Sequence, residues 1–233
     1  MIKKFAILGE RCSGTNYLMR LVEKNFGLQY TDEYGFKHFD IFYNEYKNSD
    51  DCLFIGIVRN PVNWLNSFYN NPWHVSYETA KNSESFLNNI FYSRVIDKPY
   101  LCVNPITREK TLDGWEMEAD FNFKTKKKYK NVFECRYTKL EYLMWEMQNR
   151  VKNYYFLRYE DIVQNLNNEI LNIKNKFKIP TTQQFVLNNK TYKNTKKIYK
   201  KIKYTTYSEI QITSHVDYKQ SVEEALGYVF KKK

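Results

Sequence analysis

Short apolar runs alternate with longer amphipathic stretches along this chain, and this alternation constrains the fold more than any other feature. The apolar runs have strand length and are rich in Ile, Val, Leu and Phe, as buried strands are; they are Phe5–Leu8, Leu53–Val58, Val132–Cys135 and Tyr154–Leu157. The stretches with helical spacing are Thr15–Asn25, Pro61–Tyr69, Thr138–Gln148 and Asp161–Phe177. Strands that alternate with helices form parallel βαβ units. We therefore expect an α/β three-layer sandwich with a central parallel sheet.

Several features limit the class of protein. The longest apolar run, Leu53–Val58, is far too short to span a membrane, and the apolar stretch after Met1 is too short for a secretory signal. The four cysteines lie far apart and form no CxxC pair, which argues against a disulfide scaffold or a metal knuckle. We expect a cytoplasmic protein with no membrane partner.

The chain has no Gly/Ser-rich or Pro-rich linker and no repeat, so we expect a single domain over residues 1–233. Residues 70–130 are less regular, and they contain Pro72, Pro99, Pro105 and Gly114. We expect an irregular insertion there, over the edge of the sheet where α/β folds bind ligands. Aromatic residues between Trp64 and Trp115 could stack on a sugar or phenolic acceptor, or they could belong to the core.

The charge balance is basic, with 37 Lys and Arg against 26 Asp and Glu and a formal net charge of +11. Such an excess favours polyanionic partners. Lys occurs here together with abundant Asn, Ile and Tyr, all of which have AT-rich codons, so the charge by itself identifies no partner. Two basic clusters stand out, residues 124–130 and a basic loop over 190–204, and we expect the first to be a solvated surface.

A tight loop joins the first expected strand to the first expected helix, and residues 9–16 read Gly-Glu-Arg-Cys-Ser-Gly-Thr-Asn. Free N–H groups at the start of a helix, together with its dipole, form a cradle for an anion. Arg11 would add a positive charge, and Ser13, Thr15 and Asn16 would add hydroxyl and amide donors. The loop of nucleotide hydrolases has Lys after its second Gly, where this chain has Thr15. The segment therefore predicts a phosphate cradle without the equipment for a γ-phosphate and Mg²⁺.

A second candidate phosphate site follows the second expected strand. Arg59 ends that strand, Asn60 and Pro61 favour the start of a helix, and Ser67 lies two turns along that helix. A guanidinium at the end of a strand and a hydroxyl on the adjoining helix can bind one phosphate together.

In the order and spacing of four segments the chain resembles the sulfotransferases that use 3′-phosphoadenosine-5′-phosphosulfate (PAPS). Ser13-Gly14-Thr15 is similar to the loop that binds the 5′-phosphosulfate, and Arg59-Asn60-Pro61 with Ser67 is similar to the 3′-phosphate site. Residues 157–162, Leu-Arg-Tyr-Glu-Asp-Ile, resemble the family's Tyr-Glu-Asp-Leu segment near the adenine. Residues 223–228, Glu-Glu-Ala-Leu-Gly-Tyr, are similar to the end of its C-terminal helix.

The resemblance implies a P-loop NTPase-like fold, PAPS as co-substrate, adenosine 3′,5′-bisphosphate (PAP) as product, and no metal. The implied cofactor-binding residues are Arg11, Cys12, Ser13, Gly14, Thr15, Asn16, Arg59, Ser67 and Tyr159.

Two positions depart from the family pattern. Members commonly carry a basic residue directly before Ser-Gly-Thr, where this chain has Cys12, with Arg11 one residue earlier. Either Arg11 reaches the phosphosulfate from its shifted position and takes part in catalysis, or the backbone cradle does most of the binding. The family's Arg-Lys-Gly segment at the 3′-phosphate has no clean copy, and lysines of residues 190–203 could replace it.

Sulfuryl transfer depends on positioning, on charge at the leaving phosphate and on a base for the acceptor's proton. Histidine suits that role because its pKa lies near neutrality. His38 lies between the two phosphate motifs, where family members place a catalytic His, commonly as Lys-x-His. Lys37 directly precedes it, and an extended strand would send the two to opposite faces, so Lys37 has no assigned role. We expect His38 to be the base, His74 to be the alternative and His215 to be structural.

The leading hypothesis is a PAPS-dependent sulfotransferase that acts on a hydroxyl or amine of an unidentified acceptor, a carbohydrate or small molecule. A P-loop nucleotide or nucleoside kinase is a second hypothesis, although the chain lacks the Gly-Lys-Ser/Thr loop and an Arg-rich lid. A non-catalytic sulfotransferase-like protein or nucleic-acid binder is a third, because basic and aromatic residues interleave over Tyr192–Tyr207. We do not expect nucleic acid as the partner.

Overall fold

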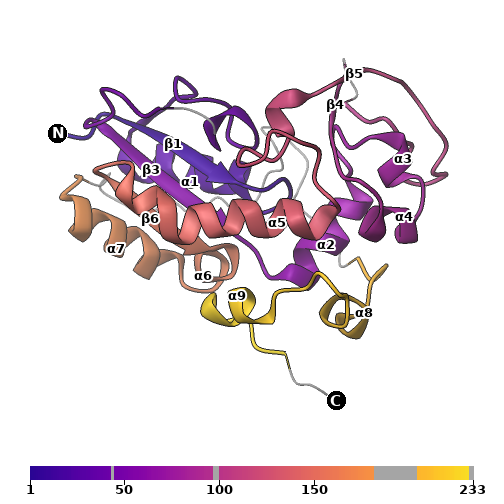
Figure 1. The fold of residues 1–233 in the computed structure, drawn as a ribbon. Helices are drawn as coiled ribbons and strands as arrows, with labels where there is room; N and C mark the ends of the chain where they lie inside the picture. The colour runs from indigo at the N-terminus through magenta and orange to yellow at the C-terminus, as the bar shows by residue number, and fades with distance from the viewer. Residues whose placement is uncertain (43–44, 97–99, 181–203, 231–233) are drawn as a thin grey trace.

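The computed structural model describes residues 1–42, 45–96, 100–180 and 204–230, and a parallel sheet lies at its centre (Figure 1). The sheet has the order β2-β1-β3-β6, with the strands β1 Lys4–Gly9, β2 Gln29–Tyr30, β3 Cys52–Val58 and β6 Tyr154–Arg158. All three strand pairs are parallel. Gly9 pairs with Ile57, and Val58 pairs with Arg158, so the strands β1, β3 and β6 end together at one edge.

Side chains alternate between two cores along the central strands, as the pleat of a strand requires. Phe5 and Ile7 point into one core, and Ala6 and Leu8 point into the other. The first core is completed by α1 Thr15–Phe26, α6 Tyr159–Gln164 and α7 Leu166–Phe177. The second is completed mainly by α2 Pro61–Asn70 and α5 Val132–Glu141. Helices therefore cover both faces of the sheet, and the expected three-layer α/β architecture is confirmed (Figure 1).

One expected strand was wrong. Val132–Cys135 is the first turn of α5, because the side chain of Asn131 caps that helix by accepting hydrogen bonds from the N–H groups of Phe133 and Glu134. The helix continues through a π turn, Tyr142–Glu146, and a 3₁₀ turn, Met147–Asn149, so the helical region ends one residue beyond the expected helix Thr138–Gln148. The expected helix Asp161–Phe177 is divided at Asn165 into α6 and α7.

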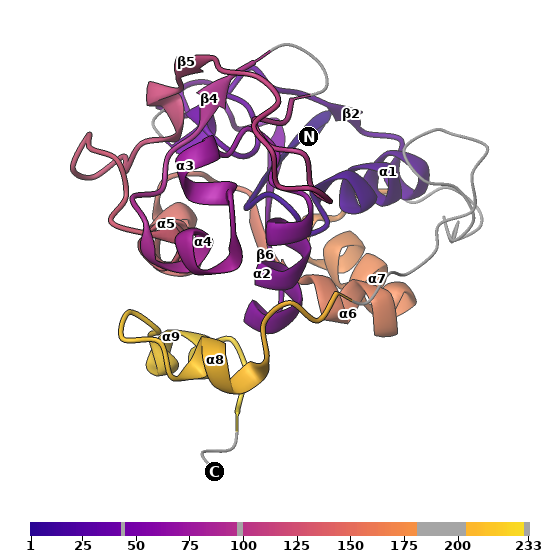
Figure 2. The same ribbon diagram turned by 90° about the vertical axis from the view of Figure 1, so that its right-hand side faces the viewer.

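Residues 70–130 are irregular and pack on the second core, to which Val75, Phe86 and Phe91 belong. Figure 2 shows their elements grouped at one side of the molecule; they are α3 Tyr77–Ala80, α4 Ser83–Asn88 and the antiparallel pair of β4 Arg94–Val95 with β5 Trp115–Glu116. Two further 3₁₀ turns, Asp40–Phe42 and Glu118–Asp120, and the C-terminal helices α8 Glu209–Thr213 and α9 Gln220–Ala225 complete the helices and strands of the described residues. No described helix is long and apolar enough to cross a membrane.

In the first basic cluster, three of the five lysines form ion pairs. Lys124 pairs with Glu146, Lys128 with Glu116 and Lys130 with Asp217. The lysines at 190–203 lie outside the described residues.

Candidate functional site

The loop between β1 and α1 closes on itself. The backbone N–H of Ser13 donates to the carbonyl oxygen of Glu10 at 3.2 Å, and the Ser13 hydroxyl donates to the same oxygen at 2.6 Å. Ser13 is fully buried, so its hydroxyl hydrogen holds the loop. Gly14 caps α1 with a φ of 99°, a left-handed conformation that favours glycine.

The start of α1 presents free backbone donors. The N–H groups of Gly14, Thr15 and Asn16 have no hydrogen-bond acceptor among the residues that the structure describes. The four N-terminal N–H groups of any helix lack an intrahelical partner and carry the positive end of its dipole. The backbone of residues 14–16 therefore offers free N–H donors at the positive end of the α1 dipole.

Arg59 and Ser67 both meet this loop at Cys12. The Nη1 of Arg59 donates to the Cys12 carbonyl oxygen at 2.9 Å, and the Cys12 sulfur lies 3.8 Å from the Ser67 carbonyl oxygen. The Nε of Arg59 is buried and has no partner among the described residues. No hydrogen bond between described residues engages the Ser67 hydroxyl. The two sequence motifs thus meet at Cys12, and neither the Nε of Arg59 nor the hydroxyl of Ser67 is bonded to a described residue.

Tyr159 forms one wall beside the loop. Its ring centroid lies 5.0 Å from the Arg59 guanidinium carbon and 6.3 Å from the ring of Tyr17. A Cβ built on Gly14 would lie 2.3 Å from Cδ2 of Tyr159, so the ring packs directly on the glycine. The adjacent Glu160 accepts hydrogen bonds from the N–H of Asn60 and the hydroxyl of Tyr228, which joins three of the four segments of the sequence resemblance.

The Arg11 side chain is already engaged. It is 5% exposed, and its guanidinium donates to Asp120 at 2.8 Å, to Ser93 at 2.7 Å and to the Trp73 carbonyl oxygen at 3.0 Å. The rings of Phe39, Phe68 and Phe91 surround it. Arg11 therefore anchors residues 70–130 to the loop through bonds within the protein.

Lys37 and His38 both contact the loop. Lys37 donates from Nζ to Oδ1 of Asn16 at 2.6 Å, and Nδ1 of His38 lies 2.6 Å from the Gly9 carbonyl oxygen. The N–H of Gly9 donates to the Lys37 carbonyl oxygen at 3.1 Å. Residues 37–39 form a turn, not the extended strand that would separate the two side chains. Lys37 thus places a positive charge beside the loop, where nucleotide hydrolases have a Lys directly after the second Gly and this chain has Thr15.

The contact of His38 with Gly9 determines its tautomer. A carbonyl oxygen only accepts, so Nδ1 carries the proton and Nε2 keeps its lone pair. Burial and the neighbouring Lys37 hold the pKa of His38 well below its usual value of 6.5. Among the described residues no hydrogen bond engages Nε2. The lowered pKa favours the neutral imidazole of His38, whose Nε2 lone pair no described residue engages.

His74 lies in the same neighbourhood. The ring of Phe39 is 6.0 Å from the rings of both His38 and His74. Nδ1 of His74 lies 3.3 Å from the Arg94 carbonyl oxygen, and burial lowers its pKa as well. His215 instead stacks on Phe133 with ring centroids 4.3 Å apart.

Four buried charged residues beside the loop carry no local sequence signal: Glu10, Asp120, Arg136 and Lys139. Asp120 binds Arg11 and Lys139, and Lys139 also donates to the His38 carbonyl oxygen at 3.0 Å. Arg136 binds Glu10 in the loop at 3.0 Å. Their partners lie as many as 126 positions away in the chain, so no local pattern marks them.

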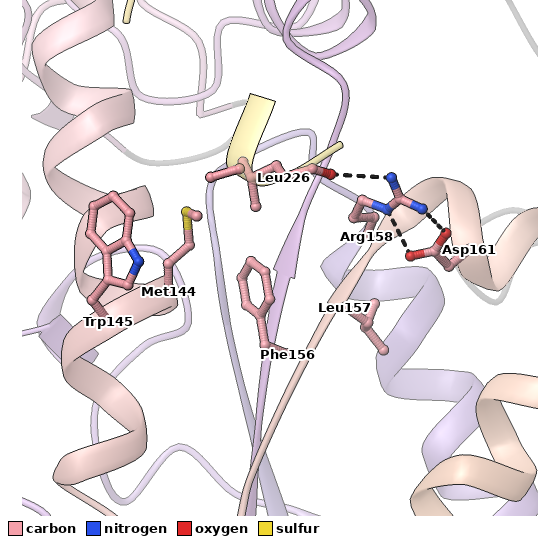
Figure 3. Close-up of a pocket in the computed structure, with 8 residues that line it drawn as sticks. Met144, Trp145, Phe156, Leu157, Arg158, Asp161 and Leu226 are labelled. Atoms are coloured by element: carbon pink, nitrogen blue, oxygen red, sulfur yellow. Dashed lines mark hydrogen bonds and ion pairs between the residues drawn. The ribbon is translucent and has the colours of Figure 1, made fainter. Parts of the chain in front are cut away.

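A separate cavity of about 330 Å³ lies beside β6 (Figure 3). It is lined by Met144, Trp145, Phe156, Leu157, Arg158, Asp161, Ala225 and Leu226. Arg158 spans its edge, with two bonds to Asp161 and one of 3.1 Å to the Leu226 carbonyl oxygen. None of the predicted site residues lines this cavity. The described residues hold no group of His, Cys, Asp and Glu that could bind a metal.

No protein-family model matches this chain, and no curated protein sequence matches it significantly. Among solved structures it is similar to the mouse sulfotransferase SULT7A1 complexed with PAP, with a TM-score of 0.39 and 16% sequence identity. The match covers 78% of this chain and 61% of that chain. A likeness this distant carries no argument about activity, so function has to be argued from the site itself.

Proposed function

We propose that this protein is a PAPS-dependent sulfotransferase that moves a sulfuryl group to a hydroxyl or amine of an acceptor. The observation that carries the proposal is the meeting of three groups at the carboxyl edge of the sheet. The free N–H groups of residues 14–16 belong to the loop itself; Arg59 and the Ser67 backbone contact the loop at Cys12, and the imidazole of His38 contacts it at Gly9. Each is a group that the sequence resemblance requires.

The nucleotide end of the site is assigned from its free donors. The N–H groups of residues 14–16 would hold the 5′-phosphosulfate, with Lys37 beside them. Arg59 would bind the 3′-phosphate through its unpaired Nε, with the Ser67 hydroxyl as a second donor. A buried donor with no partner costs about 1–3 kcal/mol, and a phosphate oxygen would remove that cost. Tyr159 would offer its ring to the adenine.

The Arg11 side chain has no place among these ligand contacts. Its guanidinium donors are bound to Asp120, Ser93 and Trp73, so we propose an anchoring role for it. Cys12 contributes its backbone, since its carbonyl oxygen receives the Arg59 hydrogen bond.

The chemical step follows from the tautomer of His38. The acceptor oxygen or nitrogen attacks sulfur, the bond from sulfur to the 5′-phosphate oxygen breaks, and its electron pair stays on the phosphate of PAP. The acceptor's proton passes to Nε2 of His38, while the hydrogen bond from Nδ1–H to the Gly9 carbonyl oxygen fixes the ring and stabilises the imidazolium. Lys37 and the backbone donors lie where negative charge develops on the leaving phosphate.

The direct test is transfer of label from [³⁵S]PAPS to a panel of carbohydrate, phenol, alcohol and amine acceptors, in the presence of a chelator. Transfer to one class, absent in His38→Ala, supports the proposal. Transfer of phosphate from ATP that requires Mg²⁺, with none from PAPS, would replace it with the kinase hypothesis.

A further inference from the structure

Arg136 is a fully buried arginine that joins three parts of the site's frame. It lies on α5, with 0% of its surface exposed, and its guanidinium stacks on Trp64. Its Nη1 donates to Glu10 at 3.0 Å, and its Nη2 donates to the carbonyl oxygen of Arg59 at 3.0 Å. Nε and Nη2 also bind both carboxylate oxygens of Glu223, at 2.7 and 3.0 Å.

Through these contacts Arg136 connects the loop before α1 with the end of β3, where the two proposed phosphate-binding groups lie. Glu10 is the first residue after β1 and accepts the bonds that close the loop, so its position sets the cradle. The Arg59 carbonyl marks the end of β3, where the Arg59 side chain leaves the sheet. A planar guanidinium offers five donors in fixed directions, and Arg136 uses them on three elements at once.

The partner carboxylate is itself held in place. Glu223 lies on α9, and the end of that helix is fixed by the bond from Arg158 to the Leu226 carbonyl oxygen (Figure 3). The Tyr228 hydroxyl donates to Glu160 at 2.7 Å, beside Tyr159. The C-terminal segment is therefore part of the frame behind the site.

We propose that Arg136, held by Glu223 of α9, is a positioning residue that sets the distance between the anion cradle and the Arg59 guanidinium. This inference rests on the proposed function, because that distance matters only for a ligand with phosphates at both ends. Arg136 does not touch the ligand. It determines how strongly the protein prefers a nucleotide with a 3′-phosphate to one without.

The test compares the dissociation constants of PAP and AMP by titration calorimetry. The variants are Glu223→Gln and Arg136→Lys, and the control is Glu224→Gln, the same change at the exposed neighbouring position. In Glu223→Gln the side-chain NH₂ would face a donor nitrogen of Arg136, so one of the two hydrogen bonds would be lost. In Arg136→Lys a single ammonium group could not reach Glu10, Arg59 and Glu223 together. We expect each to reduce the ratio of the AMP constant to the PAP constant by about tenfold, the usual effect of disturbing a charge-assisted contact. The control should keep the wild-type ratio, and AMP binding should change little in any variant.

The outcomes separate this inference from the proposed function. A wild-type protein that binds PAP no better than AMP contradicts the proposed function. A wild-type preference for PAP that persists unchanged in folded Glu223→Gln overturns the role of Arg136 alone. Far-ultraviolet circular dichroism identifies a variant that fails to fold, and Glu223→Gln keeps the test decisive if Arg136→Lys is such a variant. Equal loss of PAP and AMP affinity also contradicts the inference, because it would indicate general damage.

Discussion

Replacing Gly14 with alanine tests the packing of the loop against Tyr159. Gly14 has a φ of 99°, and a Cβ there would lie 2.3 Å from the Tyr159 ring. Gly27, at the other end of the same helix, offers a matched control. It also has a positive φ, of 64°, but a Cβ there would meet nothing within 4 Å.

The two substitutions should differ by the cost of displacing the ring. Left-handed backbone costs a non-glycine residue about 1–2 kcal/mol, which is the whole expected loss in Gly27→Ala. Gly14→Ala should lose that amount and about 1–3 kcal/mol more, the usual cost of overpacking. Tyr159 cannot yield freely, because Arg59 and Tyr17 pack on its ring. Removing the ring in Gly14→Ala/Tyr159→Ala should recover about 1–2 kcal/mol relative to additivity.

Urea unfolding of the four variants measures these differences, provided that the m values agree. A loss in Gly14→Ala no larger than in Gly27→Ala would refute the packing. So would strict additivity of Gly14→Ala and Tyr159→Ala, since it would show that the ring does not lie against the glycine.

Three further predictions concern proton transfer and buried charge. His38→Ala should lower turnover by about 10²–10⁴-fold with nearly unchanged PAP affinity, and the same loss in His74→Ala alone would move the base to His74. Lys37→Met should move the acidic limb of the rate profile to higher pH, because Lys37, after burial, lowers the pKa of His38; an unmoved limb contradicts this. Burial raises the pKa of Glu10 from 4.5 to about 7, so its contribution to stability is present below 4.5 and lost as the pH rises through 7. Between pH 5 and pH 8, the free energy of unfolding of Glu10→Gln in urea should therefore rise relative to that of the wild type by up to about 3 kcal/mol. A difference that stays constant with pH would contradict the raised pKa of Glu10.

Elements that depend only on residues adjacent in the chain could be predicted from the sequence. Strands buried on both faces are continuous apolar runs, and β1, β3 and β6 were predicted for that reason. The run Val132–Cys135 has the same composition, but Asn131 makes it the first turn of a helix, and a short apolar run alone cannot distinguish the two. The two residues of β2, Gln29 and Tyr30, carry no pattern at all.

In the site, the loop and Arg59 were predicted together from the family resemblance, and the parallel register of β1 with β3 places both at one edge of the sheet. The engagement of Arg11 was not predicted, because Asp120 lies 109 positions away. Lys37 was given no role because the segment was expected to be extended. A local bond from the Phe39 N–H to the Phe36 carbonyl oxygen closes a turn there instead, and two bonds with Gly9 hold Lys37 and His38 against the loop.

The central claim is a site for a nucleotide with phosphates at both ends, and thermal unfolding with PAP, AMP and ATP tests it most directly. PAP at about 100 times its Kd should stabilise the wild-type fold by roughly 2.7 kcal/mol and raise its Tm, whereas AMP and ATP at the same concentration should do much less. Arg59→Ala should lose most of the advantage of PAP, because a charge-assisted phosphate contact contributes about 1.5–3 kcal/mol. Equal stabilisation of the wild type by PAP and AMP would contradict the account.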